Sequence, residues 1–169
     1  MSNTLRSITL QDVADTLRLS ADTADLGKVY ARVDALARET VGHKLLTVLR
    51  FMEETQEVER LYSSDPKAYP VGGRKRLATI NKDHSLAASG EIFLAANPDE
   101  VRRTFPDHEL IFRLGASAVL NAPIRHGGRR LGTLNCCGVA DAYREKEIEA
   151  AKILANLLAP TLLGANPNG

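Results

Sequence analysis

The sequence predicts an α+β fold in which helices near both ends of the chain pack against an antiparallel sheet. The main observation is a pair of segments, Ser117–Arg125 and Arg130–Gly138, in which apolar and polar residues alternate. Between them stand Gly127 and Gly128, and paired glycines reach the positive φ angles that a tight hairpin turn requires. The second observation is that apolar residues recur at helical spacing before and after this hairpin.

Length and composition predict one ordinary globular domain, because 169 residues are enough to form a hydrophobic core. The formal net charge of +1 argues against bulk attraction to nucleic acid or to a membrane surface. No apolar run approaches the roughly 20 residues that span a bilayer, and the N-terminal residues lack the apolar region of a secretory signal. We therefore expect a cytoplasmic protein. Cys136 and Cys137 are adjacent on a strand, so neither a disulfide nor a metal site is expected.

The remaining elements follow from apolar spacing and from residues that begin or end helices. Thr9 with Asp12 is typical of a helix start, and Gly42 and Gly90 are typical of helix ends. In chain order we expect a short helix at 9–19, a longer helix at 24–40, strands at 44–52 and 57–63, an irregular basic loop at 69–76, a short helix at 84–89, a short strand at 91–95, helical turns at 97–105 and 107–114, the hairpin, and one long helix from 142 to about 163.

The two hairpin strands predict one apolar face and one mixed face. Their alternation places the site candidates Asn121, Thr133, Asn135 and Cys137 on the mixed face, and it places Leu120, Ile124 and Leu134 beneath helices. A two-residue turn with perfect pairing would instead put Asn121 opposite Leu134. Burying an unpaired amide under a helix costs about 1–3 kcal/mol, so we expect either an odd-length loop or a bulge near the arginines, which would restore the polar match.

At this point the chain resembles the GAF domain family of small-molecule sensor modules. The resemblance rests on Leu114-Gly115, on Ser117-Ala-Val-Leu-Asn-Ala-Pro-Ile124, on Gly127-Gly128 and on Leu131-Gly-Thr-Leu-Asn135. It covers about residues 22–163 and leaves an N-terminal helical extension at 1–21 and a disordered tail at 164–169. It implies a GAF-like antiparallel sheet with the N- and C-terminal helices on one face and a ligand cavity on the other.

The resemblance also implies which residues line that cavity. The positions that match the hairpin motif are Asn121, Thr133, Asn135 and Cys137, while the segments around His84 and Tyr69 correspond to the cavity lid. Three specialisations of the family do not match. The second hairpin strand lacks the Cys-His pair of bilin-binding members, Asn135 is not followed by the lysine of the cyclic-nucleotide signature, and the middle segment lacks the cysteines of free methionine sulfoxide reductases.

These features favour a sensor module that binds a small molecule without a cofactor or a metal. An alternative is a small enzyme that uses the same cavity, with Cys137 as nucleophile and His84 as base, acting on a small organic metabolite. A third possibility is a purely structural dimerisation domain. The basic clusters at 72–76 and 125–130 suit solvated turns better than an anion or nucleic-acid site.

The predicted terminal helices carry more apolar surface than one domain face can cover. The long C-terminal helix is apolar around much of its circumference, including Ile153 and Leu157, and the leading helix 10–19 has an apolar side with no evident partner. We therefore expect a homodimer joined by a helical bundle from residues 10–40 and 145–163.

Overall fold

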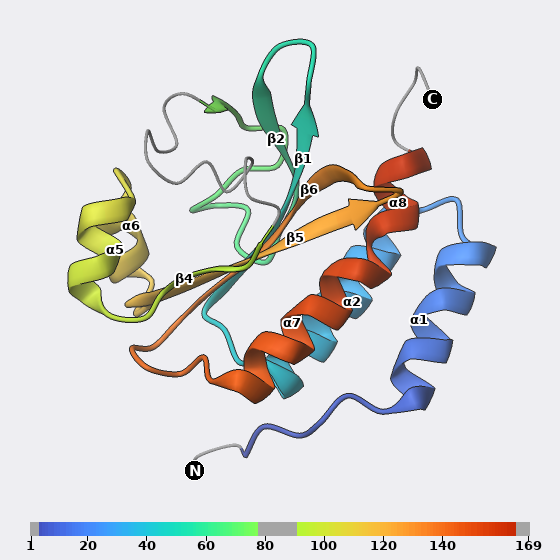
Figure 1. Ribbon diagram of the computed structural model, residues 1–169, viewed down its shortest axis with the longest axis horizontal. Helices are drawn as coiled ribbons and strands as arrows, with labels where there is room; N and C mark the ends of the chain where they lie inside the picture. The colour runs from blue at the N-terminus through green and yellow to red at the C-terminus, as the bar shows by residue number, and fades with distance from the viewer. Residues whose placement is uncertain (1–3, 78–90, 165–169) are drawn as a thin grey trace.

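The computed structural model describes residues 4–77 and 91–164, and it is organised around one antiparallel sheet (Figure 1). The strands are hydrogen-bonded in the order β3-β2-β1-β6-β5-β4. The predicted α+β class and the antiparallel sheet are confirmed. Along the chain the described elements are α1 (Leu10–Asp22), α2 (Leu26–Thr40), β1 (Leu45–Met52), β2 (Glu57–Ser63), β3 (Arg74–Arg76), β4 (Phe93–Ala95), α5 (Pro98–Thr104), α6 (His108–Arg113), β5 (Ala118–His126), β6 (Arg129–Gly138), α7 (Glu145–Leu157) and α8 (Ala159–Gly164).

The hairpin of β5 and β6 has the register that the polar residues predict. Gly127 and Gly128 both have positive φ, 56° and 75°, so they form the two-residue turn. The register then shifts between Ile124 and Arg125, which leaves one extra residue in β6. This bulge brings Asn121 directly opposite Asn135. The turn and the bulge coexist, and the predicted polar match is confirmed.

The two faces of the sheet support two separate apolar clusters. On one face α2, α7 and α8 cover the larger cluster, which includes Leu120, Ile124 and Leu134 as predicted. On the other face α5, α6 and the loop that follows β2 cover a smaller cluster, which includes Cys137 and Tyr69. Cys136 lies in the first cluster and Cys137 in the second, so the adjacent thiols point to opposite faces.

Helix α1 packs on the outside of α2 and α7, so the expectation that it has no place within the domain is wrong. Val13 and Leu19 contact the larger apolar cluster. Asp12 closes a capping box with Thr9 and also accepts hydrogen bonds from Arg6 and Arg32, with distances of 2.6 Å and 3.3 Å to the closest guanidinium nitrogens. Because α2 supplies Arg32, this buried carboxylate fixes α1 to its neighbour.

Three other sequence predictions need correction. The single long C-terminal helix is divided at Leu158 into α7 and α8, because Pro160 has no N–H to continue the hydrogen-bond ladder. Leu157 is only 6% exposed and packs inside its own domain, so it does not belong to a free apolar surface. Part of the basic loop forms an edge strand, β3, which pairs with β2. The helix predicted at 84–89 lies outside the described residues.

A buried polar contact joins α2 to the sheet on the helix-covered face. The Asp34 carboxylate accepts a hydrogen bond from the Tyr62 hydroxyl of β2 at 2.9 Å, and Nε2 of His43 lies 2.8 Å from its other oxygen. Burial disfavours the charged carboxylate, yet the contacts with His43 and Tyr62 outweigh it and lower the pKa of Asp34. The helix is therefore held by a specific polar link as well as by apolar packing.

We predict that Gly132→Ala destabilises the protein by at least about 2 kcal/mol. A Cβ atom at this β6 position would overlap the main-chain oxygen of Leu49 in β1 and lie 2.7 Å from a methyl carbon of Leu162 in α8. Chemical denaturation measures the effect, and the control is Gly164→Ala, where an added Cβ meets nothing within 4 Å. Equal stability of the two variants would contradict the close approach of β1 to β6.

Candidate ligand-binding site

A row of polar side chains crosses four strands of the sheet on the face opposite α2 and α7. Pairing registers place Ser63 opposite Thr47, Thr47 opposite Asn135, and Asn135 opposite Asn121. The row ends at Phe93 of β4, which is paired with Asn121. Directly opposed residues in antiparallel strands have Cβ atoms about 4.5–5.5 Å apart, so these side chains are immediate neighbours. We call this set, from Ser63 to Asn121, the polar row.

Three residues of the polar row are buried and Asn135 is half-buried, and the row is incompletely hydrogen-bonded. Asn121 is 4% exposed, and Ser63 and Thr47 are also buried. Asn135 donates from Nδ2 to Oγ1 of Thr47 at 3.3 Å. The Oδ1 atoms of Asn121 and Asn135 are buried, and neither has a hydrogen-bond partner. Buried polar groups in folded proteins are nearly always paired, and an unpaired one costs about 1–3 kcal/mol. Two unpaired acceptors on opposed residues therefore point to a place where a hydrogen-bond donor binds.

A second row, next to the polar row on the same face, contains Thr133. It runs from Arg60 in β2 through Leu49 and Thr133 to Pro123 in β5. Thr133 and Arg60 are both buried. The four hairpin residues predicted from the alternation thus share one face, as expected. That they bind a ligand stays a prediction.

Tyr69 packs in the apolar cluster on this face and is held by a hydrogen bond. Its hydroxyl donates to Oδ2 of Asp107, just before α6, at 2.9 Å. Burial and the nearby carboxylate both raise the pKa of Tyr69, so the phenol stays protonated and acts as a donor. The loop that carries Tyr69 is thereby linked to α6. His84, the other residue predicted for the lid, lies outside the described residues.

The environment of Cys137 is that of an inert thiol. Cys137 lies among apolar side chains of the smaller cluster, and burial, with a contribution from Asp107, raises its pKa to about 12. A nucleophilic cysteine requires the opposite shift, because the thiolate is the reacting species. The described part of the chain also has no group of three or more His, Cys, Asp or Glu residues that could hold a metal ion. The geometry thus favours binding over covalent catalysis.

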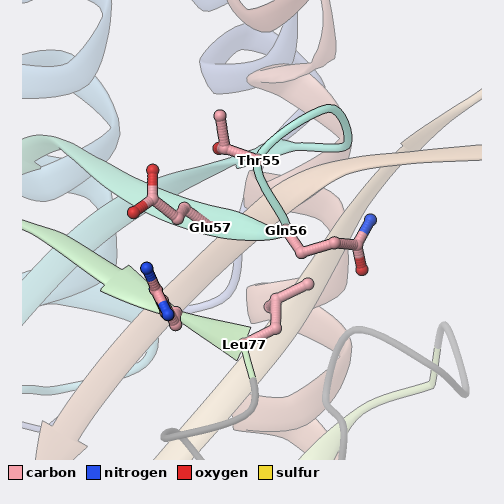
Figure 2. A pocket seen from close by; sticks show the side chains of 5 residues that line it. Thr55, Gln56, Glu57 and Leu77 are labelled. Carbon is pink, nitrogen blue, oxygen red and sulfur yellow. The ribbon is translucent and has the colours of Figure 1, made fainter.

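A separate hollow of about 600 Å³ lies at the turn between β1 and β2, beside β3 (Figure 2). It is lined by Thr55, Gln56, Glu57, Arg76 and Leu77. The two charged residues of this hollow, Glu57 and Arg76, occupy paired positions on adjacent strands. Arg76 already has an interaction partner. The hollow lacks the unpaired buried atoms of the polar row, so we take the polar row as the candidate site.

Sequence reasoning missed the contribution of β1 and β2 to this face. Thr47 is a polar residue within an otherwise apolar stretch of β1. That break in the apolar pattern could have identified Thr47 as a candidate site residue. Arg60 and Ser63 had no comparable signal, because polar residues are common in an amphipathic strand such as β2. Their position on the face depends on a register shift between β1 and β2, which the sequence does not encode locally.

Comparisons with known proteins identify the fold. The sequence model of the GAF domain matches residues 9–162, which is most of the chain. No curated protein matches it in sequence. Among solved structures, the GAF domain of a phosphoenolpyruvate-protein phosphotransferase from Coxiella burnetii is 16% identical with a TM-score of 0.74, and the alignment covers 92% of this chain and 93% of that one.

Two further structures show the same likeness. The GAF domain of an Acinetobacter phosphoenolpyruvate-protein phosphotransferase is 12% identical over 95% of each chain, with a TM-score of 0.74. A free methionine-R-sulfoxide reductase from Neisseria meningitidis, solved in complex with its substrate, is 15% identical over 96% of this chain and 97% of that one, with a TM-score of 0.70. At these identities the likeness establishes the fold.

We predict that both thiols of the folded protein react slowly with iodoacetamide at neutral pH. For Cys137, a pKa of about 12 in place of 9.0 lowers the thiolate fraction roughly a thousandfold. Mass spectrometry of timed samples, with the denatured protein as control, measures the rate. Rapid modification of Cys137 in the folded chain would contradict its burial and protonation and would favour the enzyme alternative.

Proposed function

The chain belongs to the GAF domain family, and on that premise we propose that it is a sensor module that binds a small molecule over the polar row. Members of this family are generally ligand-binding sensory modules. The observation that supports the proposal most directly is the pair of unpaired, buried amide oxygens on Asn121 and Asn135. A ligand with an N–H or O–H group would supply the missing donor.

Each candidate residue has a distinct part in this proposal. Asn121 and Asn135 accept hydrogen bonds from the ligand, and Thr133 offers a hydroxyl from the neighbouring row. Cys137 and Tyr69 form the apolar and aromatic parts of the wall of the binding site, since both belong to the smaller apolar cluster on this face. The roles of these residues, and that of His84, are part of the proposal.

The enzyme alternative has less support. The Neisseria reductase demonstrates that a chain of this fold can act on a small substrate. In the present chain, however, the candidate nucleophile Cys137 is buried and its pKa is raised. A reversible ligand accounts for the unpaired amides without requiring a reactive thiol.

We also propose that the protein is a homodimer joined through its terminal helices. Leu10 and Leu17 on α1 are 84% and 46% exposed, and Ile153 on α7 and Leu163 on α8 are exposed as well. Large apolar side chains on the outer surface of adjacent helices suit a two-fold interface. Leu157, which was expected to take part, is excluded by its burial. The two free cysteines suit a reducing compartment such as the cytoplasm, where we place the protein.

The ligand is sought by a thermal-shift screen of a metabolite library against the wild-type protein and Asn121→Leu. We expect the variant to be at least as stable as the wild type without ligand, because it removes an unpaired buried amide. We expect compounds that stabilise the wild type to lose their effect on the variant. The control is Asn97→Leu, which removes the side chain that caps α5 and should lower stability while preserving the response to ligand. Equal stabilisation of Asn121→Leu and wild type by every hit would refute the proposed site.

The dimer is tested by light scattering at micromolar concentration on wild type and the double variant Leu10→Glu/Leu17→Glu. The wild type should have the mass of two chains and the variant the mass of one, because two buried charges per protomer oppose association. Val71→Glu, which changes an exposed residue outside the terminal helices, should leave the mass at two chains. A wild-type mass of one chain would contradict the proposal.

A further inference from the structure

Arg60 is a buried cation on the same face as the polar row. It is 9% exposed and lies in β2, opposite Leu49 and in the row that contains Thr133. Its guanidinium carbon lies 5.0 Å from the centre of the Tyr69 ring. Tyr69 packs in the same cluster as Leu45 and Cys137, on the far side of the polar row from Thr133. The Arg60 side chain therefore extends from its own row back toward the polar row.

One edge of the Arg60 guanidinium is free. Nη1 donates to the main-chain oxygen of Pro70 at 2.9 Å. Nε is buried without a hydrogen-bond partner, and the only hydrogen bond recorded for this side chain within residues 4–77 and 91–164 is that of Nη1. The Nε–Nη2 edge presents two parallel N–H groups, which is the geometry that binds both oxygens of a carboxylate.

The charge of Arg60 has no ion-pair partner among the described residues. No carboxylate of those residues lies within 4.0 Å of it, whereas Arg50, one position beyond Leu49 on the facing strand, pairs with Glu59. Asp107 is the nearby acid, but Tyr69 and Lys75 already occupy its Oδ2. Burial lowers the pKa of Arg60, and the electrostatic effects of Tyr69 and Asp107 only partly oppose it. A buried cation that no described carboxylate pairs with costs several kcal/mol, which favours an anion bound at this position.

We propose that the ligand of this site is a small organic acid whose carboxylate binds the Nε–Nη2 edge of Arg60 and whose N–H or O–H group donates to Asn121 and Asn135. This inference rests on the proposed function and specifies the chemistry of the ligand. The Nε–Nη2 edge of Arg60 is cationic and selects an anionic group of the ligand. The amide oxygens of Asn121 and Asn135 are acceptors and select a hydrogen-bond donor. A carboxylate carries one negative charge and matches the single guanidinium, whereas a phosphate carries about −1.5 to −2.

The test uses isothermal titration and thermal shift with a panel of amino, hydroxy and N-acetylamino acids, together with their primary amides and inorganic phosphate. The variants are Arg60→Lys, which keeps the charge but removes the two-pronged edge, and Arg60→Gln, which removes both. The matched control is Arg102→Lys. Arg102 also stacks on an aromatic ring, that of Phe112, but it is exposed and paired with Asp99.

We expect at least one acid to bind the wild type and its amide to bind at least about 30-fold more weakly. We expect Arg60→Gln and Arg60→Lys to weaken the binding of that acid by a similar factor. Arg102→Lys should have no effect on its binding. If uncharged compounds bind with dependence on Asn121 but not on Arg60, the proposed function stands and this inference is wrong. Preferential binding of phosphate, or no binding by any acid of the panel, overturns the inference as well.

Discussion

The register between β5 and β6 is the constraint on which the rest of the site depends. With a two-residue glycine turn and no bulge, each polar residue of one strand would be paired with an apolar residue of the other. The bulge between Ile124 and Arg125 shifts the pairing by one residue, so that polar residues face polar residues. As a result Asn121 faces Asn135, while Leu120, Ile124 and Leu134 face the helices. A separate register, between β1 and β6, places Thr47 opposite Asn135. A slip of one residue would bury the amides under α7 and expose the core, so one bulge determines both the apolar core and the polar row.

The polar row and the larger apolar cluster lie on opposite faces of the same strands. Ligand binding at the polar row can therefore affect the helices that pack on the other face. In β6, Asn135 stands between Leu134 and Cys136, and both of these pack in the cluster under the helices. In β5, Asn121 stands between Leu120 and Ala122, which belong to that same cluster. A donor that satisfies the two amides would therefore stabilise strands whose other face carries α2 and α7. Those helices in turn hold α1, through Arg32 and Asp12 among other contacts. In this account the free energy that the unpaired amides cost in the free protein is recovered when the ligand binds.

The sequence predicted the elements with strong local signals and missed those that depend on long-range pairing. The hairpin, its faces and the pairing of polar residues followed from glycine chemistry and from the cost of burying Asn121, while the choice between an odd-length loop and a bulge did not. Strand β3 was missed because a run of three basic residues has no strand signature until β2 pairs with it. The break at Pro160 was overlooked although proline is a local signal. Arg60 could not be recognised as a site residue, because its burial and its missing counter-ion arise from contacts with Tyr69 and Pro70 in the folded chain.

The most direct test of the central claim is a crystal structure of the protein with a compound that stabilises it. We expect donor atoms of the compound to lie within hydrogen-bond distance, about 2.7–3.2 Å, of Oδ1 of Asn121 and of Oδ1 of Asn135. The compound should lie against that face and leave the helix-covered face unchanged. Density for the compound in the hollow between Thr55 and Leu77, or on the outer surface of the terminal helices, with the two amide oxygens still unpaired, would contradict the account.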